Sequence, residues 1–291
     1  MSTSVVELEL AEGERERLLW RLCRSGRLAD LLALVVEDRD RDQDVHVEIV
    51  TLLAGRDREV GHTPYRSDVV PDTAAEFTQA LQRWGRANRR SFPWRETRDP
   101  FRILVAEVLL QRSRGKTVAM VYEELFDRWP DAEALTNARV SSIRSVIRPL
   151  GLVKRAATLK ALAGAVIERG GVPKTLEGLL ALPGVGLYAA SATLAVAFGR
   201  RQGVVDGVTA RVYRRYFGLA GEGPASTDSK LWDLVESVTP SRGVRGWNWS
   251  VLDLAATLCL PGRPRCNECP LQADCRWAAL DLRGSSLAWT R

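Results

Sequence analysis

The stretch LPGVGLYAASATLAVAFGRRQGVVDGVTARVYRRY, residues 182–216, decides the expected fold. The pattern predicts a short helix over 175–182, a tight turn at 183–186, and a second helix over 187–198 that stops at Gly199. A turn with two glycines at the start of a helix presents backbone N–H groups to an anion, and the helix dipole assists. Such turns are also common as simple connections between helices. The turn alone therefore leaves both a phosphate site and a structural role open.

Asp206 stands just before the next expected helix, among several arginines. Aspartate is one of the best N-cap residues, so a purely structural role is open for it. A phosphate-binding turn, one positioned carboxylate and a basic flank together indicate nucleic-acid chemistry. The basic flank consists of Arg200, Arg201, Arg211, Arg214 and Arg215.

The composition of the 291-residue chain, 45% apolar and 27% charged, is ordinary for a globular protein, and the length suits two domains with an appendage. Residues 1–75 hold 10 Arg and 16 acidic residues, whereas the remainder holds 32 Lys and Arg and 20 acidic residues. The basic main body suits a polyanion, although charge alone does not separate nucleic acid from a membrane surface. Since no bilayer-spanning segment or signal pattern is found, we expect a cytoplasmic protein without a membrane partner.

The apolar spacing of the main body is helical, and no segment there has the period of a strand, so we expect an all-α fold. Residues 1–75 read as a separate small unit, with a helix over 14–34 and either a strand or a helix over 45–53. The helices expected before the hairpin cover 73–88, 99–112, 117–128, 131–136, 140–147 and 153–169.

Glu107 lies within ILVAEVLL, residues 103–110, where apolar residues surround a single carboxylate. An ionised carboxylate is costly in such surroundings, so its pKa should rise and it should keep a proton near neutral pH. A carboxyl group of this kind can act as a general acid. The alternative is that Glu107 lies on the solvent stripe of an amphipathic helix. The apolar residues on nearly every side favour the functional role.

Four cysteines near the end of the chain have the spacing C-x6-C-x2-C-x5-C. In a cytoplasmic protein this pattern indicates a metal site rather than disulfides. Four thiolates suit either zinc or an iron–sulfur cluster, and the single close pair favours the cluster. The expected ligands are Cys259, Cys266, Cys269 and Cys275.

Taken together, these motifs resemble those of the helix-hairpin-helix DNA glycosylase superfamily that carries a [4Fe-4S] cluster. The likeness runs from about Phe77 to Trp277 and leaves residues 1–75 uncovered. The matching motifs are PWR at 93–95, EVLLQ at 107–111, LPGVGLY at 182–188, VDG at 205–207, and the four-cysteine loop.

The resemblance implies two helical domains with the DNA in the groove between them. A six-helix barrel domain with the helix-hairpin-helix would cover 101–210, and a [4Fe-4S] domain would combine 76–100 with 211–291. Residues 1–75 would be an acidic extension of unknown role. The implied partner is double-stranded DNA with a mismatched or damaged base, flipped out of the stack for reaction, and we expect a monomer.

The resemblance also assigns roles to residues. Asp206 falls on the aspartate that stabilises the oxocarbenium-like sugar, and Glu107 on the acid that contacts or protonates the leaving base. Tyr188 falls where a related strand-cleaving branch has its Schiff-base lysine, which implies a monofunctional enzyme. Arg112 falls where the family inserts a side chain into the gap left by the flipped nucleotide. The remaining DNA contacts implied are Gln111, Gly184, Val185, Gly186 and Arg211.

Two branches combine Glu, Tyr and Asp in these positions: MutY-type adenine glycosylases and Mig-type thymine/uracil mismatch glycosylases. The adenine branch usually has glutamine where this chain has Arg112, and a C-terminal domain where only 16 residues follow Cys275. Both differences favour thymine or uracil opposite guanine. Val208 replaces the family's asparagine, which leaves another modified base open. A non-catalytic iron–sulfur DNA-binding protein is the alternative outside enzymology.

Overall fold

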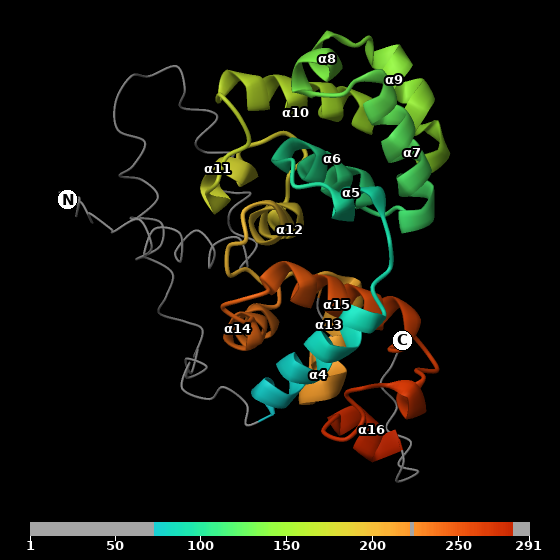
Figure 1. Cartoon of the computed structure of the whole chain (residues 1–291), viewed down its shortest axis with the longest axis vertical. Coiled ribbons are helices and arrows are strands. Elements are labelled where there is room, and N and C mark those ends of the chain that lie inside the picture. Colours follow the sequence, from blue (N-terminus) through green and yellow to red (C-terminus); the bar gives the residue numbers. More distant parts are fainter. Residues whose placement is uncertain (1–72, 222–223, 282–291) are drawn as a thin grey trace, which may run out of the picture.

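The structure, a computed structural model, describes residues 73–221 and 224–281. The regular elements of these residues are all helices, which confirms the all-α prediction. Figure 1 shows them in two groups, one above the other. The expected helix over 14–34 and the undecided segment 45–53 lie outside the described residues.

The upper group in Figure 1 holds the helices between residues 93 and 197. Within it, α10 contacts α8, α9 and α6, while α6 also packs on α12, α7 and α5. Its elements are α5 (Pro93–Glu96), α6 (Pro100–Leu110), α7 (Gly115–Arg128), α8 (Ala132–Asn137), α9 (Val140–Ile147), the 3-10 turn η1 (Arg148–Leu150), α10 (Arg155–Glu168), α11 (Leu176–Leu180) and α12 (Leu187–Ala197).

The lower group joins the first described helix to the last ones. Helix α15 packs on α4 and α13, and it also contacts α12 of the upper group. The elements are α4 (Ala74–Ala87), α13 (Gly207–Phe217), α14 (Ser229–Val238), α15 (Val244–Thr257), the 3-10 turn η2 (Cys266–Glu268) and α16 (Arg276–Asp281). The residue boundaries of the two expected domains stay a prediction.

Helix α6 starts as the sequence predicts and ends earlier. The Asp99 carboxylate accepts hydrogen bonds from the backbone of Phe101 and Arg102, and Pro100 occupies the first helical position, where its missing N–H costs nothing. The expected end at Arg112 is wrong. Helix α6 stops at Leu110 because Gln111 is extended (ψ 115°) and Arg112 has φ 55°. Of the non-glycine residues described, Arg112 alone has a positive φ.

The apolar helices α6 and α12 form the centre of the molecule. Residues 103–109 of α6 and 189–196 of α12 are buried without a break. Because many side chains of α12 are alanine, α6 packs directly on it. A helix buried on all sides has no solvent stripe, so any carboxyl group in residues 103–109 is inside the protein. No helix in the described residues is long and apolar enough to cross a membrane.

Candidate active site

Asp206 is the N-cap residue of α13, and its carboxylate is held on one side only. Its Oδ1 accepts from the backbone N–H of Val208 at 2.9 Å and of Thr209 at 2.7 Å, and the Thr209 hydroxyl lies 3.0 Å from it. The Thr209 hydroxyl in turn accepts from the Asp206 N–H at 2.9 Å, which completes a capping box. Among the described residues, none donates a hydrogen bond to Oδ2. The cap fixes the carboxylate and leaves one oxygen for other chemistry.

Glu107 is buried in the middle of α6, at 6% exposure, so the solvent-stripe alternative does not apply. Its Oε2 has no hydrogen-bond partner among the described residues. Burial raises the pKa of Glu107 from 4.5 to about 8; the charge of Arg95 lowers this pKa and that of Asp206 raises it. The group therefore carries a proton at neutral pH. A buried carboxyl oxygen without a protein partner is rare and calls for an explanation, such as a catalytic role or a bound water.

Tyr188 lies in the first turn of α12, which packs on α6. Burial raises the pKa of this phenol well above 10, and the charges of Glu107 and Asp206 raise it further, whereas Arg95 lowers it. Glu107, Tyr188 and Asp206 thus act on one another electrostatically, although 99 residues separate Glu107 from Asp206 in the printed numbering. The three residues predicted to be catalytic lie together, between α6, α12 and the start of α13.

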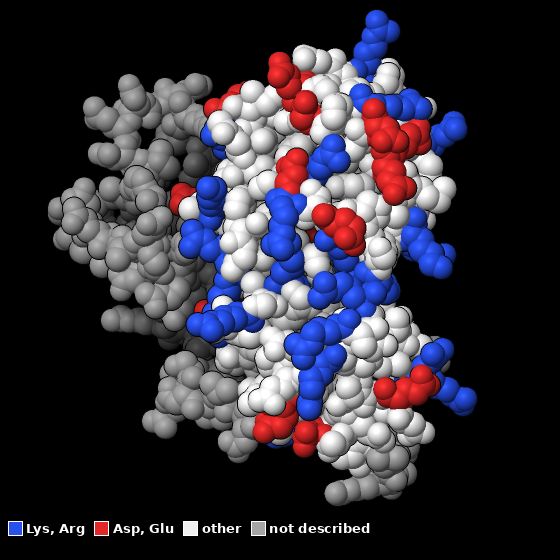
Figure 2. All heavy atoms as spheres, in the orientation of Figure 1, with Lys and Arg blue, Asp and Glu red and all other residues white. Residues whose placement is uncertain are grey.

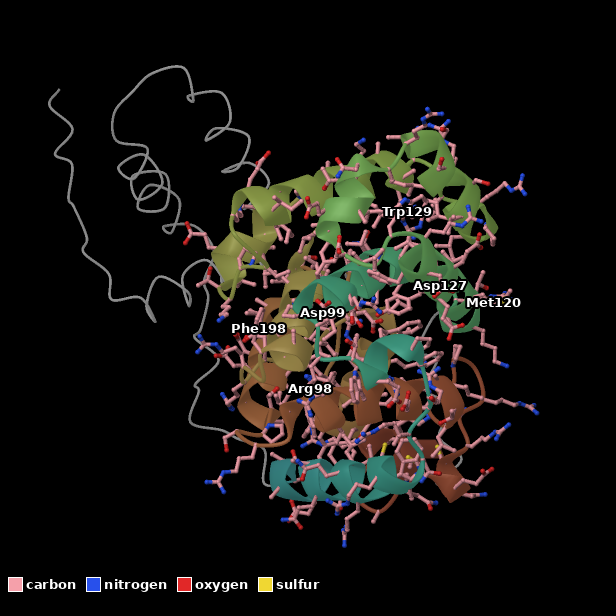
Figure 3. All side chains as sticks on the ribbon, turned by 45° about the horizontal axis from the view of Figure 1, so that its top comes forward. Arg98, Asp99, Met120, Asp127, Trp129 and Phe198 are labelled. Atoms are coloured by element: carbon pink, nitrogen blue, oxygen red, sulfur yellow. The ribbon has the colours of Figure 1, made fainter. Side chains whose placement is uncertain are left out.

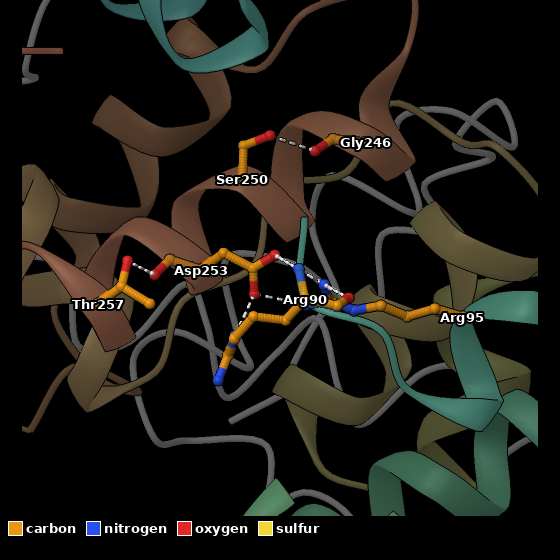
Figure 4. A network of polar contacts seen from close by, with 6 residues as sticks. All are labelled: Arg90, Arg95, Gly246, Ser250, Asp253 and Thr257. Carbon is orange, nitrogen blue, oxygen red and sulfur yellow. Dashed lines mark hydrogen bonds and ion pairs between the residues drawn. The ribbon is translucent and has the colours of Figure 1, made fainter. Parts of the chain in front are cut away.

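Arg95 is a fourth member that the sequence analysis did not place. Its side chain is 4% exposed and makes a two-pronged ion pair with Asp253 of α15, at 2.7 and 3.0 Å. Asp253 also accepts from the backbone and side chain of Arg90, as Figure 4 shows. The guanidinium of Arg95 lies 5.2 Å from the centre of the Trp249 ring. This anchored cation is the positive charge that opposes the effect of burial on Glu107.

The hairpin turn and the loop after α6 touch. The Gln111 side-chain amide donates to the Gly184 carbonyl at 2.9 Å. Gly184 has φ 76°, and a Cβ there would lie 2.4 Å from Thr158 of α10, so glycine is required for two reasons. The Val185 N–H is used within the turn, bonded to the Leu182 carbonyl at 3.2 Å, and its side chain is buried. Gly186 is exposed and forms the N-cap of α12. The roles predicted for these residues toward DNA stay predictions.

Arg211 has contacts of another kind than the predicted one. Its guanidinium donates to the carbonyls of Cys259 at 2.8 Å and Ala255 at 2.9 Å, at the C-terminal end of α15. Arg215, one turn further along α13, donates to the Leu260 carbonyl at 2.7 Å and lies 3.5 Å from the Cys259 sulfur. Helix α13 thus carries Asp206 at its start and holds the cysteine loop by its arginines.

The four cysteines of the C-terminal motif are free thiols that line a single pocket. In the described part of the chain, no three or more His, Cys, Asp or Glu side chains are arranged to hold a metal ion. The other residues around the pocket are mostly apolar. They include Val212, Tyr216, Leu254, Leu258, Leu271 and Trp277.

Basic side chains gather between the two helix groups. Figure 2 shows Lys and Arg spread across the middle of one face, where the upper and lower groups of Figure 1 meet. In Figure 3, Asp99 lies at the start of α6, and Arg98 beside it lies toward the lower group. Burial lowers the pKa of Arg245 of α15, and the charge of Arg98 lowers it further. A band of this sign at the junction suits a polyanion.

Comparison with known proteins identifies the family. Residues 105–237 match the HhH-GPD superfamily of base excision DNA repair proteins. A thymine/uracil-DNA glycosylase from Methanothermobacter thermautotrophicus is 35% identical over 69% of this chain and 92% of its own length. The chain belongs to the HhH-GPD superfamily. It is thus a base-excision DNA glycosylase, a hydrolase of N-glycosyl bonds, as the resemblance implied.

Three further proteins place this HhH-GPD protein among its relatives. It superimposes on a thermostable thymine-DNA glycosylase with a TM-score of 0.68 and 35% identity, covering 71% of this chain and 97% of that one. An adenine DNA glycosylase from Rattus norvegicus is 34% identical over 74% of this chain and 44% of its own length. Endonuclease III in a complex with DNA shares the fold, with a TM-score of 0.61 at 22% identity.

The matched family region contains only part of the HhH-GPD site. Glu107, Tyr188 and Asp206 fall inside residues 105–237, as does the Arg112 loop. The ion pair of Arg95 with Asp253 falls outside it. A sequence signal for Asp253 existed: it is the one carboxylate in VRGWNWSVLDLAAT, residues 244–257, and the reasoning applied to Glu107 would have identified it.

Proposed function

We propose that this chain is a monofunctional DNA glycosylase that releases thymine or uracil mispaired with guanine. The observation that carries the proposal is the difference between two neighbouring carboxyl groups. Glu107 is buried and protonated, whereas Asp206 is held by N–H groups with one oxygen left over. Two carboxyl groups in unlike environments are what cleavage of a glycosidic bond requires.

Asp206 acts on the sugar in this mechanism. As the bond between the base and C1′ breaks, its electron pair leaves with the base and positive charge develops on the sugar. The Asp206 carboxylate, oriented by the Val208 and Thr209 N–H groups, stabilises that charge. Since the capping box fixes the carboxylate before substrate binds, little reorganisation is needed in the transition state.

Glu107 acts on the base and then on water. Its proton neutralises the negative charge that develops on the departing base. The resulting carboxylate accepts a proton from the water that adds to C1′, which restores the acid. The products are the free base and a sugar with a hydroxyl group at C1′, so one water is consumed. Arg95 keeps the ionised form of Glu107 accessible, since its charge lowers the pKa that burial raises.

Tyr188 supports the monofunctional assignment. A phenol forms no imine with C1′, and the pKa of Tyr188, raised well above 10, keeps it protonated. In our proposal it positions the flipped nucleotide between α6 and α12. No residue here then forms a covalent link to the sugar.

We further propose that Cys259, Cys266, Cys269 and Cys275 hold a [4Fe-4S] cluster. Four thiols in one apolar pocket support this assignment. When bound, the cluster would supply structural ligation that ties the loop after α15 to α16. Arg211 and Arg215 hold the same loop from α13.

The choice of thymine or uracil rests on the relatives and on Arg112, because the adenine branch usually has glutamine at the position of Arg112. The first three relatives are a thymine-DNA glycosylase and two thymine/uracil-DNA glycosylases, at 35–38% identity over 86–93% of their lengths. Adenine DNA glycosylases at 34% identity over 40–44% of their lengths keep adenine as the second candidate. As a repair enzyme for genomic DNA, the protein would act in the cytoplasm of a prokaryotic cell, at the nucleoid.

Single-turnover excision separates the two substrates. Matched duplexes contain G·T, G·U, or adenine opposite 8-oxoguanine, with the normal pairs as controls. The proposal predicts faster release of thymine or uracil than of adenine. Faster release of adenine would overturn it, and the Asp206→Asn protein shows whether any release belongs to this site.

A further inference from the structure

The loop between α6 and α7 is held by one side chain of α10. Arg155, the first residue of α10, donates to the Leu109 carbonyl at 3.0 Å, to the Ser113 hydroxyl at 3.1 Å, and to the Gln111 carbonyl. The two carbonyls belong to the C-terminal end of α6, where they have no partner within the helix. A cation there also opposes the negative end of the helix dipole.

Arg112, in the loop that Arg155 holds, has a strained backbone conformation. Arg112 lies between Gln111 and Ser113, both bonded to Arg155, and its φ is 55°. A non-glycine residue in the left-handed region is energetically unfavourable and persists only where its surroundings impose it. The three bonds from Arg155 are such an imposition. The side chain of Arg112 is exposed; burial lowers the pKa of Arg155, and the charge of Arg112 lowers it further.

The same helix also supports the hairpin. Thr158, one turn after Arg155, fills the space that a Cβ of Gly184 would take, 2.4 Å from it. The hairpin is in turn joined to the loop by the bond from Gln111 to the Gly184 carbonyl. The first turn of α10 therefore fixes the loop and the hairpin relative to each other.

We infer that Arg155 is a positioning residue for base flipping. It imposes the left-handed conformation on Arg112. This conformation directs the Arg112 side chain into the stacked bases of the DNA, while the hairpin binds the DNA backbone. This inference rests on the proposed insertion of Arg112. It adds a residue that does not itself touch DNA and acts only through Arg112.

A lysine cannot replace Arg155 in this role. The three acceptors lie on two sides of the guanidinium, and a planar fork with five N–H groups serves them at once. An ammonium group is a point charge with a different geometry. Arg155→Lys therefore keeps the charge and loses the brace, which separates geometry from electrostatics.

Lys160 offers a matched control on the same helix. It donates to the Ala138 carbonyl at 2.9 Å, at the C-terminal end of α8. Lys160→Met thus also removes one positive charge from α10 and one bond to a helix-end carbonyl. The carbonyl that it holds belongs to the end of α8, which packs on α10.

The test is a double-mutant cycle of Arg112→Ala and Arg155→Met, read by flipping rather than by excision. A duplex with 2-aminopurine next to a G·U mismatch reports unstacking by its fluorescence. We expect each single variant to lower the flipping equilibrium about tenfold, and the double variant to fall no further, since coupled residues are not additive. Lys160→Met should match the wild type. Single-turnover excision rates of the same proteins are then measured on the duplex from which the wild type releases a base fastest.

The inference would be overturned if the two single decreases in the flipping equilibrium multiplied in the double variant. It would also be overturned if Lys160→Met lowered the flipping equilibrium as much as Arg155→Met. If Arg155→Met does not fold, the cycle is run with Arg155→Lys, for which the same two outcomes decide. The proposed substrate is tested separately, because the fluorescence change does not require that uracil be released. If the wild type flips the base but releases only adenine, the proposed substrate is refuted. The role of Arg155 is still decided by the fluorescence cycle.

Discussion

Arg95 and Asp253 join the two helix groups at the candidate site by a buried ion pair with both guanidinium branches engaged, at 2.7 and 3.0 Å. Arg95 belongs to α5 and Asp253 to α15, and the side chain of Asp253 is 1% exposed. The carboxylate is further satisfied by Arg90, so few of its acceptor positions remain unused. Arg95 therefore contributes both to the contact between the groups and to the pKa of Glu107, which burial raises and the charge of Arg95 lowers.

Removing one partner of this pair should therefore cost stability. Asp253→Asn leaves the buried charge of Arg95 without its counter-ion, and we expect a loss of about 3–5 kcal/mol in the free energy of unfolding. Urea denaturation measures it. Arg128→Met, which removes an exposed pair with Glu124, is the control and should cost under about 1 kcal/mol. Equal losses in the two variants would contradict the role given to Asp253.

The protonated state of Glu107 predicts a pH dependence of two kinds. Its pKa of about 8 lies above its ordinary value of 4.5, so excision that needs the acid should be fastest below pH 8 and should decline above it. Single-turnover rates measured from about pH 6 to about pH 9 follow this decline, the alkaline limb of the pH profile. Glu107→Gln should lose the limb together with most of the activity. A rate that rises through pH 8 would contradict the assignment.

The same shift predicts a change in stability. Because the folded protein holds the Glu107 proton up to about pH 8 and the unfolded chain releases it near 4.5, stability from this group falls as pH rises between these values. Glu107→Gln removes that loss. We expect its Tm to exceed that of the wild type above pH 8 and the two to converge toward pH 4.5. Parallel curves would show that Glu107 does not titrate as stated.

Tyr188 predicts the outcome of covalent trapping. Borohydride reduces an imine between a lysine and C1′, and a phenol forms none, so the wild type should give little trapped enzyme–DNA complex. Tyr188→Lys should give more, since in our proposal this position contacts the flipped nucleotide, and the charges of Glu107 and Asp206 act on it after the effect of burial. Tyr188→Phe is the control for loss of the hydroxyl and should trap nothing. Efficient trapping by the wild type would show that another amine reaches the sugar.

The cysteine pocket predicts metal content. Protein prepared without oxygen should contain about four irons per chain and absorb visible light, as expected of a [4Fe-4S] cluster. Cys266→Ser and Cys269→Ser should lose the iron and destabilise the loop that Arg211 and Arg215 hold. Stoichiometric zinc in place of iron would show that the pocket is a zinc site.

Much of the fold was predictable because it depends on local patterns. The helix starts at Asp99 and Asp206 follow from capping, and the ends at Leu110 and Phe217 follow from turn residues only in part. Gly218, with φ 67°, is a recognisable stop. The end at Leu110 is not, because Arg112 has no intrinsic preference for φ 55° and is held there by Arg155, 43 residues further along the printed sequence.

The site divides in the same way. Glu107 was predictable because its neighbours in sequence are also its neighbours in the core. The electrostatic partners of Arg95 were not, because Asp253 lies 158 residues away and meets it only when α15 packs on the upper group. Arg211 is a predicted DNA contact, and its bonds from Nε and Nη2 to the carbonyls of Cys259 and Ala255 were not predictable from the basic run in which it stands.

The central claim is that Asp206 stabilises the sugar as the base departs, and one measurement tests it most directly. Single-turnover excision from a G·U duplex is compared between the wild type and Asp206→Asn, with DNA affinity measured in parallel. An amide can still accept the N–H bonds of Val208 and Thr209, so the helix cap is kept and the negative charge is lost.

We predict that the excision rate falls by at least about 10²–10³-fold, as for other groups that stabilise transition-state charge, while affinity for the duplex stays almost unchanged. A near-normal rate in Asp206→Asn would contradict the account, because the negative charge on this side chain would then have no part in breaking the bond.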